Sequence, residues 1–353
     1  MRRQRPSFRR WEGSRSFCRL SIIVSLIGKG IFWLGALFVL LWFVITRPVK
    51  LHFCSCPSEN KVNHVRLKEH LRKLSEDFVP RDYQHPDNML RAAEYIRQAL
   101  LPCADTVALQ AFTVAREGEY VNVLAEYGPD TKEILVVGAH YDAFSVFPGA
   151  DDNASGVAGL IELGGLLARL DLRSRVELVA YALEEPPFFA TQDMGSAVHA
   201  RSLKTQGKTV SLAIVLEMIG FFSDAKGSQS YPAPLLQLYY PDKGNFIAVV
   251  DQVFSTKAQD VKSAINLCTD LPAYSINAPA AVPGIDFSDH RNYWAEGFPA
   301  VMVTDTAFYR NSSYHSAHDT FDTLDYDKMA QVVYGIFKYI EKNYAKEPHS
   351  QEN

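Results

Sequence analysis

The stretch Glu133–Gly156, EILVVGAHYDAFSVFPGADDNASG, joins an apolar run to a polar cluster and then to the start of a helix. Its apolar and β-branched part, Ile134–Ala139, is typical of a strand that is buried on both faces of a sheet. The run ends at His140. After a loop, the cluster Asp151–Asn153 leads into an apolar-periodic segment, Val157–Leu170, that predicts a helix. A strand, a polar loop and a helix start therefore follow one another in one short unit.

The polar residues of this unit permit two interpretations. In open α/β sheets, ligands bind at the carboxyl ends of strands, where His140 and Asp142 would lie. Zinc takes imidazole nitrogen and carboxylate oxygen as ligands at about 2.0–2.2 Å. However, Asp and Asn are also common caps at helix starts, which would explain Asp151–Asn153 without a metal. The residues further along the chain have to decide between the two interpretations.

The N-terminal part of the chain predicts a membrane anchor. Residues 1–20 contain seven arginines and one glutamate, and residues 21–46 are apolar apart from Lys29 and a few small or polar residues. This run is long enough to cross a bilayer core of about 30 Å. The arginine-rich leader favours a cytoplasmic N-terminus, which puts the rest of the chain in the periplasm, a lumen or outside the cell. A cleaved signal peptide fits less well, because Arg47–Lys50 lacks a small-residue cleavage pattern.

The length of 353 residues and the hydrophobic content of 47% suit one large catalytic domain and a short extra segment. The whole chain has 36 basic and 40 acidic residues, so the part after the leader has 29 and 39. This acidic excess disfavours nucleic-acid binding. We expect a basic leader (1–20), a transmembrane anchor (21–46), a stalk (47–61), a catalytic domain (62–345) and a tail (346–353).

The periodicity of the body predicts an α/β protein. Strands separated by helices imply right-handed crossovers and a doubly wound, mixed and mainly parallel sheet flanked by helices. We expect helices at 65–74, 89–101, 157–170, 195–204 and 326–344, and strands at 107–114, 120–127, 134–139, 176–183, 211–216 and 300–304. Weaker signals indicate a strand at 235–240, a helix at 245–254 and a loop at 277–284, and we expect the walls of a substrate pocket within this region.

Carboxylates follow two further predicted strands. Glu184 and Glu185 come directly after Val176–Leu183, and Glu217 follows Ser211–Leu216. Adjacent carboxylates at a strand end point to opposite sides, so one can bind a metal while the other reaches its bound water, as a metallohydrolase requires. An acidic pair can also be a solvated surface feature. The apolar residues before it and the prolines after it favour a site.

Six short motifs occur in order along the body: HYD from 140, GADDNASG from 149, EE from 184, LEMIG from 216, SDH from 288 and YHSAHDT from 314. In this order the chain resembles the co-catalytic zinc aminopeptidase family, whose relatives include glutamate carboxypeptidases and glutaminyl cyclases. The resemblance covers about residues 62–344. It implies a zinc-peptidase fold, and hydrolysis of the first peptide bond in a peptide with a free N-terminus.

The resemblance also implies a set of metal ligands. His140 and Glu217 would hold one zinc ion, Glu185 and His315 would hold another, and Asp152 would bridge the two. Two zinc ions are expected, and a single ion is possible.

The remaining roles follow from the same resemblance. Glu184 would be the general base that acts on the water held between the ions. Tyr314 would donate a hydrogen bond to the developing oxyanion. Asp151, which precedes the bridging residue, would be a loop or capping group.

Supporting roles fall to residues beside the ligands. Asp142 would accept a hydrogen bond from the far nitrogen of His140 and so fix its tautomer. Asp289 and His290 would support the pocket. His318 is expected to be an exposed loop histidine.

Two departures from the family keep a second function in view. Many di-zinc aminopeptidases have an aspartate where this chain has Glu217, and Pro186–Met194 is longer than in compact aminopeptidases. The alternative is a glutaminyl-peptide cyclotransferase, which would use the same scaffold. A non-catalytic, receptor-like module is a third possibility, which the presence of every ligand and of the base disfavours.

Overall fold

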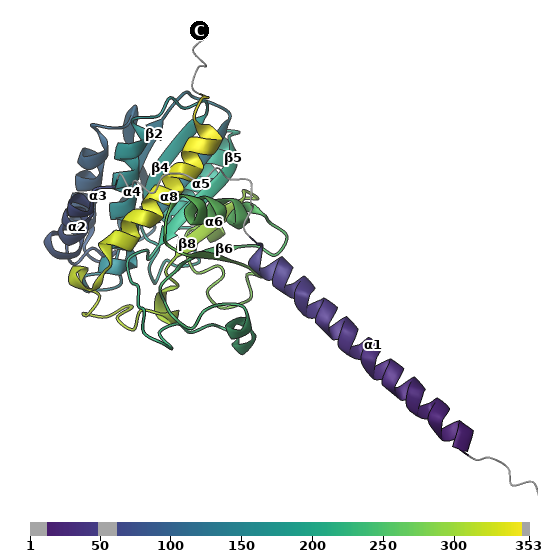
Figure 1. Ribbon diagram of the computed structural model, residues 1–353. Coiled ribbons are helices and arrows are strands. Elements are labelled where there is room, and N and C mark those ends of the chain that lie inside the picture. The colour runs from purple at the N-terminus through teal and green to yellow at the C-terminus, as the bar shows by residue number, and fades with distance from the viewer. Residues whose placement is uncertain (1–12, 49–61, 348–353) are drawn as a thin grey trace, which may run out of the picture. The chain divides into compact units, whose positions relative to one another are not determined.

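The computed structural model describes residues 13–48 and 62–347. Helix α1 (Gly13–Thr46) contains a 21-residue apolar segment, Leu26–Thr46, which is long and apolar enough to cross a membrane. A separate compact unit starts at Ile45 and contains the rest of the described chain (Figure 1). Most of the expected leader, stalk and tail lies outside the described residues. Of the expected stalk, Arg47 and Pro48 are described, and the Arg47 guanidinium donates to the Val253 carbonyl at 2.9 Å.

The body is built on an eight-stranded sheet with the strand order β1-β2-β4-β3-β5-β8-β6-β7. Strands β4, β3, β5 and β8 run parallel to one another. The β1–β2 hairpin joins β4 antiparallel, and the parallel pair β6–β7 joins β8 antiparallel. The strands are β1 (Thr106–Val114), β2 (Gly118–Tyr127), β3 (Glu133–His140), β4 (Arg175–Tyr181), β5 (Thr209–Glu217), β6 (Ile247–Asp251), β7 (Ala273–Asn277) and β8 (Ala300–Thr304).

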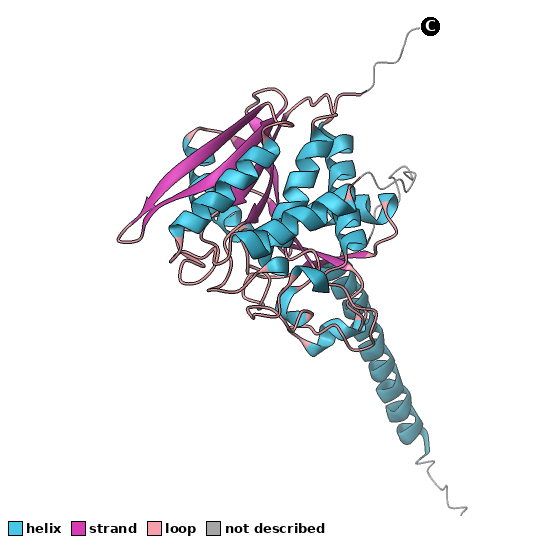
Figure 2. Ribbon diagram, turned by 90° about the vertical axis from the view of Figure 1, so that its left-hand side faces the viewer, coloured by secondary structure: helices cyan, strands magenta, loops and turns pink. Residues whose placement is uncertain are grey.

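Helices cover both faces of this sheet (Figure 2). Alternate residues of β3 enter different cores: Leu135, Val137 and Ala139 belong to the larger core, whereas Ile134 and Val136 belong to a second one. The larger core is covered by α2 (His64–Arg72), α3 (Pro86–Leu100), α4 (Gly156–Leu167), α6 (Lys257–Cys268) and α8 (Tyr326–Tyr344), and the second by α5 (Gly195–Thr205) and α7 (His290–Ala295). This arrangement confirms the predicted doubly wound α/β fold.

Short helical turns complete the body. They are η1 (Lys73–Asp77), η2 (Ala150–Ser155), η3 (Pro234–Leu238), η4 (Ala307–Tyr309) and η5 (Phe321–Thr323). The η2 turn stands between β3 and α4, at the place where the sequence has its polar cluster.

The expected elements between residues 235 and 254 are wrong. The segment 235–240, expected as a strand, contains the turn η3, and the segment 245–254, expected as a helix, contains the buried strand β6. Short apolar runs of this kind fit a buried strand and a helix equally well, so periodicity alone does not separate them. The sequence patterns do not predict α6, β7 or α7.

The parallel strands bring distant residues to one edge of the sheet. Strand β3 ends at His140, β5 ends at Glu217, and β4 ends at Tyr181, shortly before Glu184 and Glu185. Because neighbouring parallel strands have their carboxyl ends at the same edge, the polar residues that follow them gather there. This edge is the position of the candidate site.

Candidate metal centre

All five residues expected to bind metal converge, in two groups. One group is His140, Asp152 and Glu217, and the other is Asp152, Glu185 and His315; within each group the ligand atoms lie within 4.8 Å of one another. All except His315 are buried. Asp152 belongs to both groups, so its carboxylate lies between them.

The distances within each group suit a bound cation. His140 Nε2 lies 3.3 Å from Asp152 Oδ1 and 3.4 Å from Glu217 Oε2. His315 Nε2 lies 3.1 Å from Asp152 Oδ2 and 3.2 Å from Glu185 Oε2. Ligands of a tetrahedral zinc ion, bound at about 2.1 Å, lie about 3.4 Å apart. The two oxygens of Asp152 therefore face different candidate cation positions.

Unpaired atoms in the centre also suit a metal. His140 Nε2, His315 Nε2 and Glu185 Oε1 are buried without a hydrogen bond in the described part of the chain. Burying a polar atom without a partner costs free energy, which a cation bound at that atom would recover. The residues present thus fit the metal that the motifs imply.

Asp152 is held by neighbours that fix its backbone. The Asp319 carboxylate accepts the backbone N–H groups of Asp151 and Asp152, at 2.9 and 3.1 Å. The Asn153 amide donates to the Leu216 carbonyl at the end of β5, at 2.8 Å. These bonds connect the turn η2 to the strand that ends at Glu217. Asp319 belongs to the motif YHSAHDT, but its bonds to η2 depend on the fold and could not be foreseen from the motif.

Asp142 supports the centre in a way that differs from the expectation. Nδ1 of His140 lies 3.2 Å from the Asp142 backbone carbonyl and 3.4 Å from the Asp142 carboxylate. The carboxylate itself accepts the backbone N–H groups of Glu184 and Glu185, at 3.1 and 3.0 Å. An Nδ1–H donated towards Asp142 leaves the Nε2 lone pair of His140 free for a metal.

His315 is oriented by two aromatic rings. Its imidazole stacks on Phe144, with ring centroids 4.0 Å apart, and on Tyr314, with centroids 3.7 Å apart. Since both rings lie nearly parallel to the imidazole, they restrict its rotation and keep Nε2 directed at Asp152 and Glu185. Phe144 is a contributor that no sequence motif indicated.

Glu184 is buried beside the ligands but belongs to neither group. Its Oε2 lies 3.9 Å from His140 Nε2. Burial raises the pKa of Glu184 well above its usual value, and the nearby carboxylates of Glu217 and Glu185 raise it further. A carboxylate in this position can accept a proton beside the centre without being a ligand.

Asp289 and His290, two of the expected supporting residues, make different kinds of contact from each other. Asp289 accepts a hydrogen bond from Ser196 Oγ at 2.5 Å, and burial raises its pKa to about 7. Nε2 of His290 donates to the Ile285 carbonyl at 2.8 Å, and no described contact joins His290 to a candidate ligand. Ser288, in the same motif, donates to Glu217 Oε2 at 2.7 Å, which the sequence analysis missed.

The charges at the centre are strongly coupled. Burial raises the pKa of Glu185 to about 8 and also raises that of Glu217. Burial opposes the charge of His315, but the neighbouring carboxylates of Asp152 and Glu185 raise its pKa to about 9. Burial alone would raise the pKa of Asp152, but the two neighbouring histidines, His140 and His315, lower it below its usual value.

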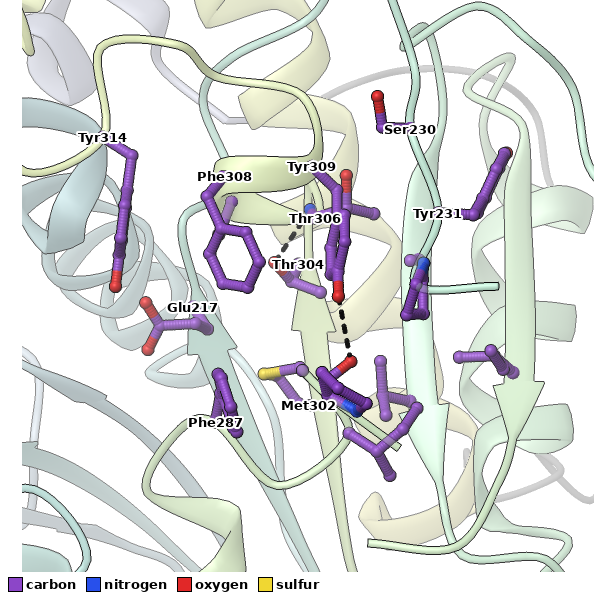
Figure 3. Close-up of a pocket in the computed structure, with 18 of the residues that line it drawn as sticks. Glu217, Ser230, Tyr231, Phe287, Met302, Thr304, Thr306, Phe308, Tyr309 and Tyr314 are labelled. Carbon is purple, nitrogen blue, oxygen red and sulfur yellow. Dashed lines mark hydrogen bonds between the residues drawn. The ribbon is translucent and has the colours of Figure 1, made fainter. Parts of the chain in front are cut away.

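A pocket of about 260 Å³ extends from the centre over β6, β7 and β8. In Figure 3, Tyr314 and Glu217 lie at one end of the pocket, and Ser230 and Tyr231 lie at the other. Apart from the residues of the metal centre, the lining residues carry no charge, and many are aromatic, including Phe189, Phe246, Phe287 and Phe308. The pocket is therefore suited to an apolar group.

Residues 122–340 match the sequence model of peptidase family M28. The chain belongs to this family. It is 48% identical over 280 residues to the uncharacterized protein YfbL of Escherichia coli K12, an alignment that covers 77% of this chain and 85% of YfbL.

Solved structures show the same fold. The zinc aminopeptidase BSAP from Bacillus subtilis superposes with a TM-score of 0.65 at 12% identity, over 83% of this chain and 98% of BSAP. A glutaminyl cyclase from Bacteroides thetaiotaomicron superposes with a TM-score of 0.57 at 16% identity, over 79% of this chain and 97% of the cyclase. Two of the three kinds of enzyme named by the sequence resemblance, the zinc aminopeptidases and the glutaminyl cyclases, therefore share this architecture.

Metal affinity should increase as the pH rises from about 6 to about 9, because ligands must lose their protons before they bind a cation. The pKa values of Glu185, about 8, and His315, about 9, place this proton release in that range. Isothermal titration with Co²⁺ at several pH values measures the effect. The His318→Ala variant, which changes an exposed histidine, should behave like the wild type. An affinity that is constant over this range would contradict the assigned ligands.

Proposed function

We propose that the protein is a membrane-anchored zinc aminopeptidase. The observation that carries the proposal is the pair of ligand groups that share Asp152, each with a buried histidine nitrogen that has no hydrogen bond. His140 and Glu217 would hold one zinc ion, Glu185 and His315 a second, with Asp152 between them. When bound, zinc would lower the pKa of water towards about 7 and polarise the substrate carbonyl.

The residues around the ligands would carry the proton and the substrate. Glu184 would take a proton from the attacking water and return it to the leaving amine, so no covalent intermediate is needed. Its position beside His140, outside both ligand groups, supports this role. Tyr314 lines the pocket beside Glu217 (Figure 3). Its hydroxyl would donate a hydrogen bond to the developing oxyanion.

The pocket supports a preference among substrates. Its walls beyond the metal centre are uncharged and largely aromatic, so a charged side chain would lose hydration there without gaining a partner. The peptide would therefore present its free N-terminus at the metal centre and place an apolar first side chain in the pocket.

The Glu184→Gln variant should bind metal like the wild type and lose turnover on aminoacyl amides by about 10²- to 10⁴-fold, because only proton transfer is removed. Metal content and release of the N-terminal residue are measured on the same preparation. Glu117→Gln, which changes an exposed carboxylate in the β1–β2 turn, is the matched control and should keep wild-type activity.

Other results of this assay would contradict the proposal. Unchanged turnover in Glu184→Gln would exclude that residue as the base. Conversion of glutamine-initiated peptides to pyroglutamyl peptides, without release of an N-terminal residue, would identify a glutaminyl cyclase. A wild-type protein that neither binds metal nor turns over substrate would indicate a non-catalytic module.

The Ala248→Phe variant should narrow the pocket, because Ala248 lies in β6 and lines the pocket wall. We expect kcat/KM for a phenylalanyl amide to fall by about tenfold or more, while that for an alanyl amide changes little. The two substrates serve as internal controls for each other. An equal loss on both would show that the first side chain does not enter this pocket.

The apolar segment Leu26–Thr46 should anchor the protein with its N-terminus in the cytoplasm, because arginine-rich flanks stay on that side of a membrane. In bacteria, the full chain should resist extraction by alkaline carbonate, and a C-terminal alkaline phosphatase fusion should be active. A variant without residues 1–46 should give an inactive fusion. Processing of the full chain to a shorter soluble form would instead identify a signal peptide.

A further inference from the structure

Arg81 is fully buried, yet its guanidinium bonds only to backbone carbonyls. Nε donates to Tyr141 at 2.9 Å, and Nη1 donates to Leu74 at 2.7 Å and to Pro148 at 2.5 Å. Nη2 donates to Gly149. A buried arginine is usually paired with a carboxylate. In the described part of the chain, no carboxylate lies within ion-pair distance of the Arg81 guanidinium.

Three of the four carbonyls lie at the two ends of one loop. The loop Tyr141–Gly149 starts directly after His140 and ends shortly before Asp152. Arg81 holds its first end through Tyr141 and its last end through Pro148 and Gly149. A single rigid, planar group thus spans the loop that joins two of the proposed metal ligands.

Further contacts connect Arg81 to the rest of the body. Its backbone carbonyl accepts the N–H group of Ala143 within the same loop, at 3.0 Å. The bond to the Leu74 carbonyl connects the guanidinium to the turn η1. The loop is therefore held against the helical layer and not merely to itself.

Gly149 permits the Arg81 guanidinium to approach the end of the loop closely. We call the hydrogen bonds from Arg81 to Tyr141, Pro148 and Gly149 the clamp. The φ of Gly149 is +54°, which disfavours other residues, and a Cβ at this position would lie 3.0 Å from Arg81 Nη2 and 2.3 Å from the Asp152 carbonyl. The guanidinium, the loop end and the backbone of a proposed ligand are therefore packed against one another without free space.

We infer that Arg81 is a positioning residue that fixes the separation of His140 and Asp152 and so preorganises the metal centre. The inference rests on the proposed function, since it concerns the same centre. Arg81 does not bind the metal or the substrate. It acts through the loop, as groups outside the ligand shell commonly do.

The positive charge of Arg81 and its hydrogen bonds to the loop have opposite expected effects on metal affinity. The guanidinium interacts favourably with the carboxylates of Asp152, Asp142, Glu185 and Asp319. A fixed positive charge repels a bound cation, so removal of the charge alone would tighten metal binding. Loss of the clamp would weaken metal binding. The sign of the change therefore separates the two roles.

The test uses the full chain and Co²⁺ as the probe, because the visible absorption of Co²⁺ reports its coordination geometry. Arg81→Met removes both the charge and the clamp. Arg81→Lys keeps the charge, but the lysine ammonium cannot donate to both ends of the loop at once. We expect both variants to bind Co²⁺ about 10- to 100-fold more weakly and with an altered spectrum.

The matched control is Arg310→Met. Arg310 is also buried and also donates to a backbone carbonyl, that of Phe221, but it makes no described hydrogen bond to the loop. This variant should bind Co²⁺ like the wild type. Thermal unfolding of the metal-free proteins shows whether each variant folds.

The inference would be overturned if either Arg81 variant bound Co²⁺ with an affinity equal to or higher than that of the wild type. If Arg81→Met does not fold, Arg81→Lys decides; if neither folds while Arg310→Met does, Arg81 is a general structural residue and the inference is wrong. A wild type that binds Co²⁺ but releases no N-terminal residue would overturn only the proposed function.

Discussion

The repulsion among buried carboxylates at the carboxyl edge of the sheet is the constraint on which the rest of this structure depends. Glu184, Glu185 and Glu217 are buried near Asp152, and burial raises the pKa of each glutamate. Carboxylates this close cannot all ionise without cations nearby. The parallel strands bring these groups together, and the backbone bonds accepted by Asp142 and Asp319 keep them there although their charges repel one another.

Much of the fold could be predicted from the sequence because its central elements are long and strongly periodic. The expected helix 326–344 coincides with α8, and the expected strand 107–114 lies within β1. The failures lie between residues 235 and 295, where the short strands β6 and β7 and the six-residue helix α7 fit more than one assignment by periodicity. This is also the region that forms much of the pocket, so its shape could not be foreseen.

The candidate ligands could be named from the sequence because each stands in a motif at a strand end. The residues that hold these ligands in place could not be named from the sequence. Arg81, Phe144 and Ser288 reach the centre through contacts that depend on how a loop folds, and a single sequence carries no local pattern for such contacts. Asp142 shows the intermediate case: its place beside His140 was predicted, whereas its bonds to the backbone of Glu184 and Glu185 depend on the neighbouring strand.

The position of Asp152 in both ligand groups has a thermodynamic consequence. One carboxylate cannot respond to a cation on one side without changing its charge distribution and orientation towards the other side. If both positions bind a cation, their occupancy would be cooperative. Ordering of the shared carboxylate would favour binding of the second cation, whereas repulsion between the two cations would oppose it. A half-loaded protein would be a distinct species with its own stability, and not an average of the empty and full states.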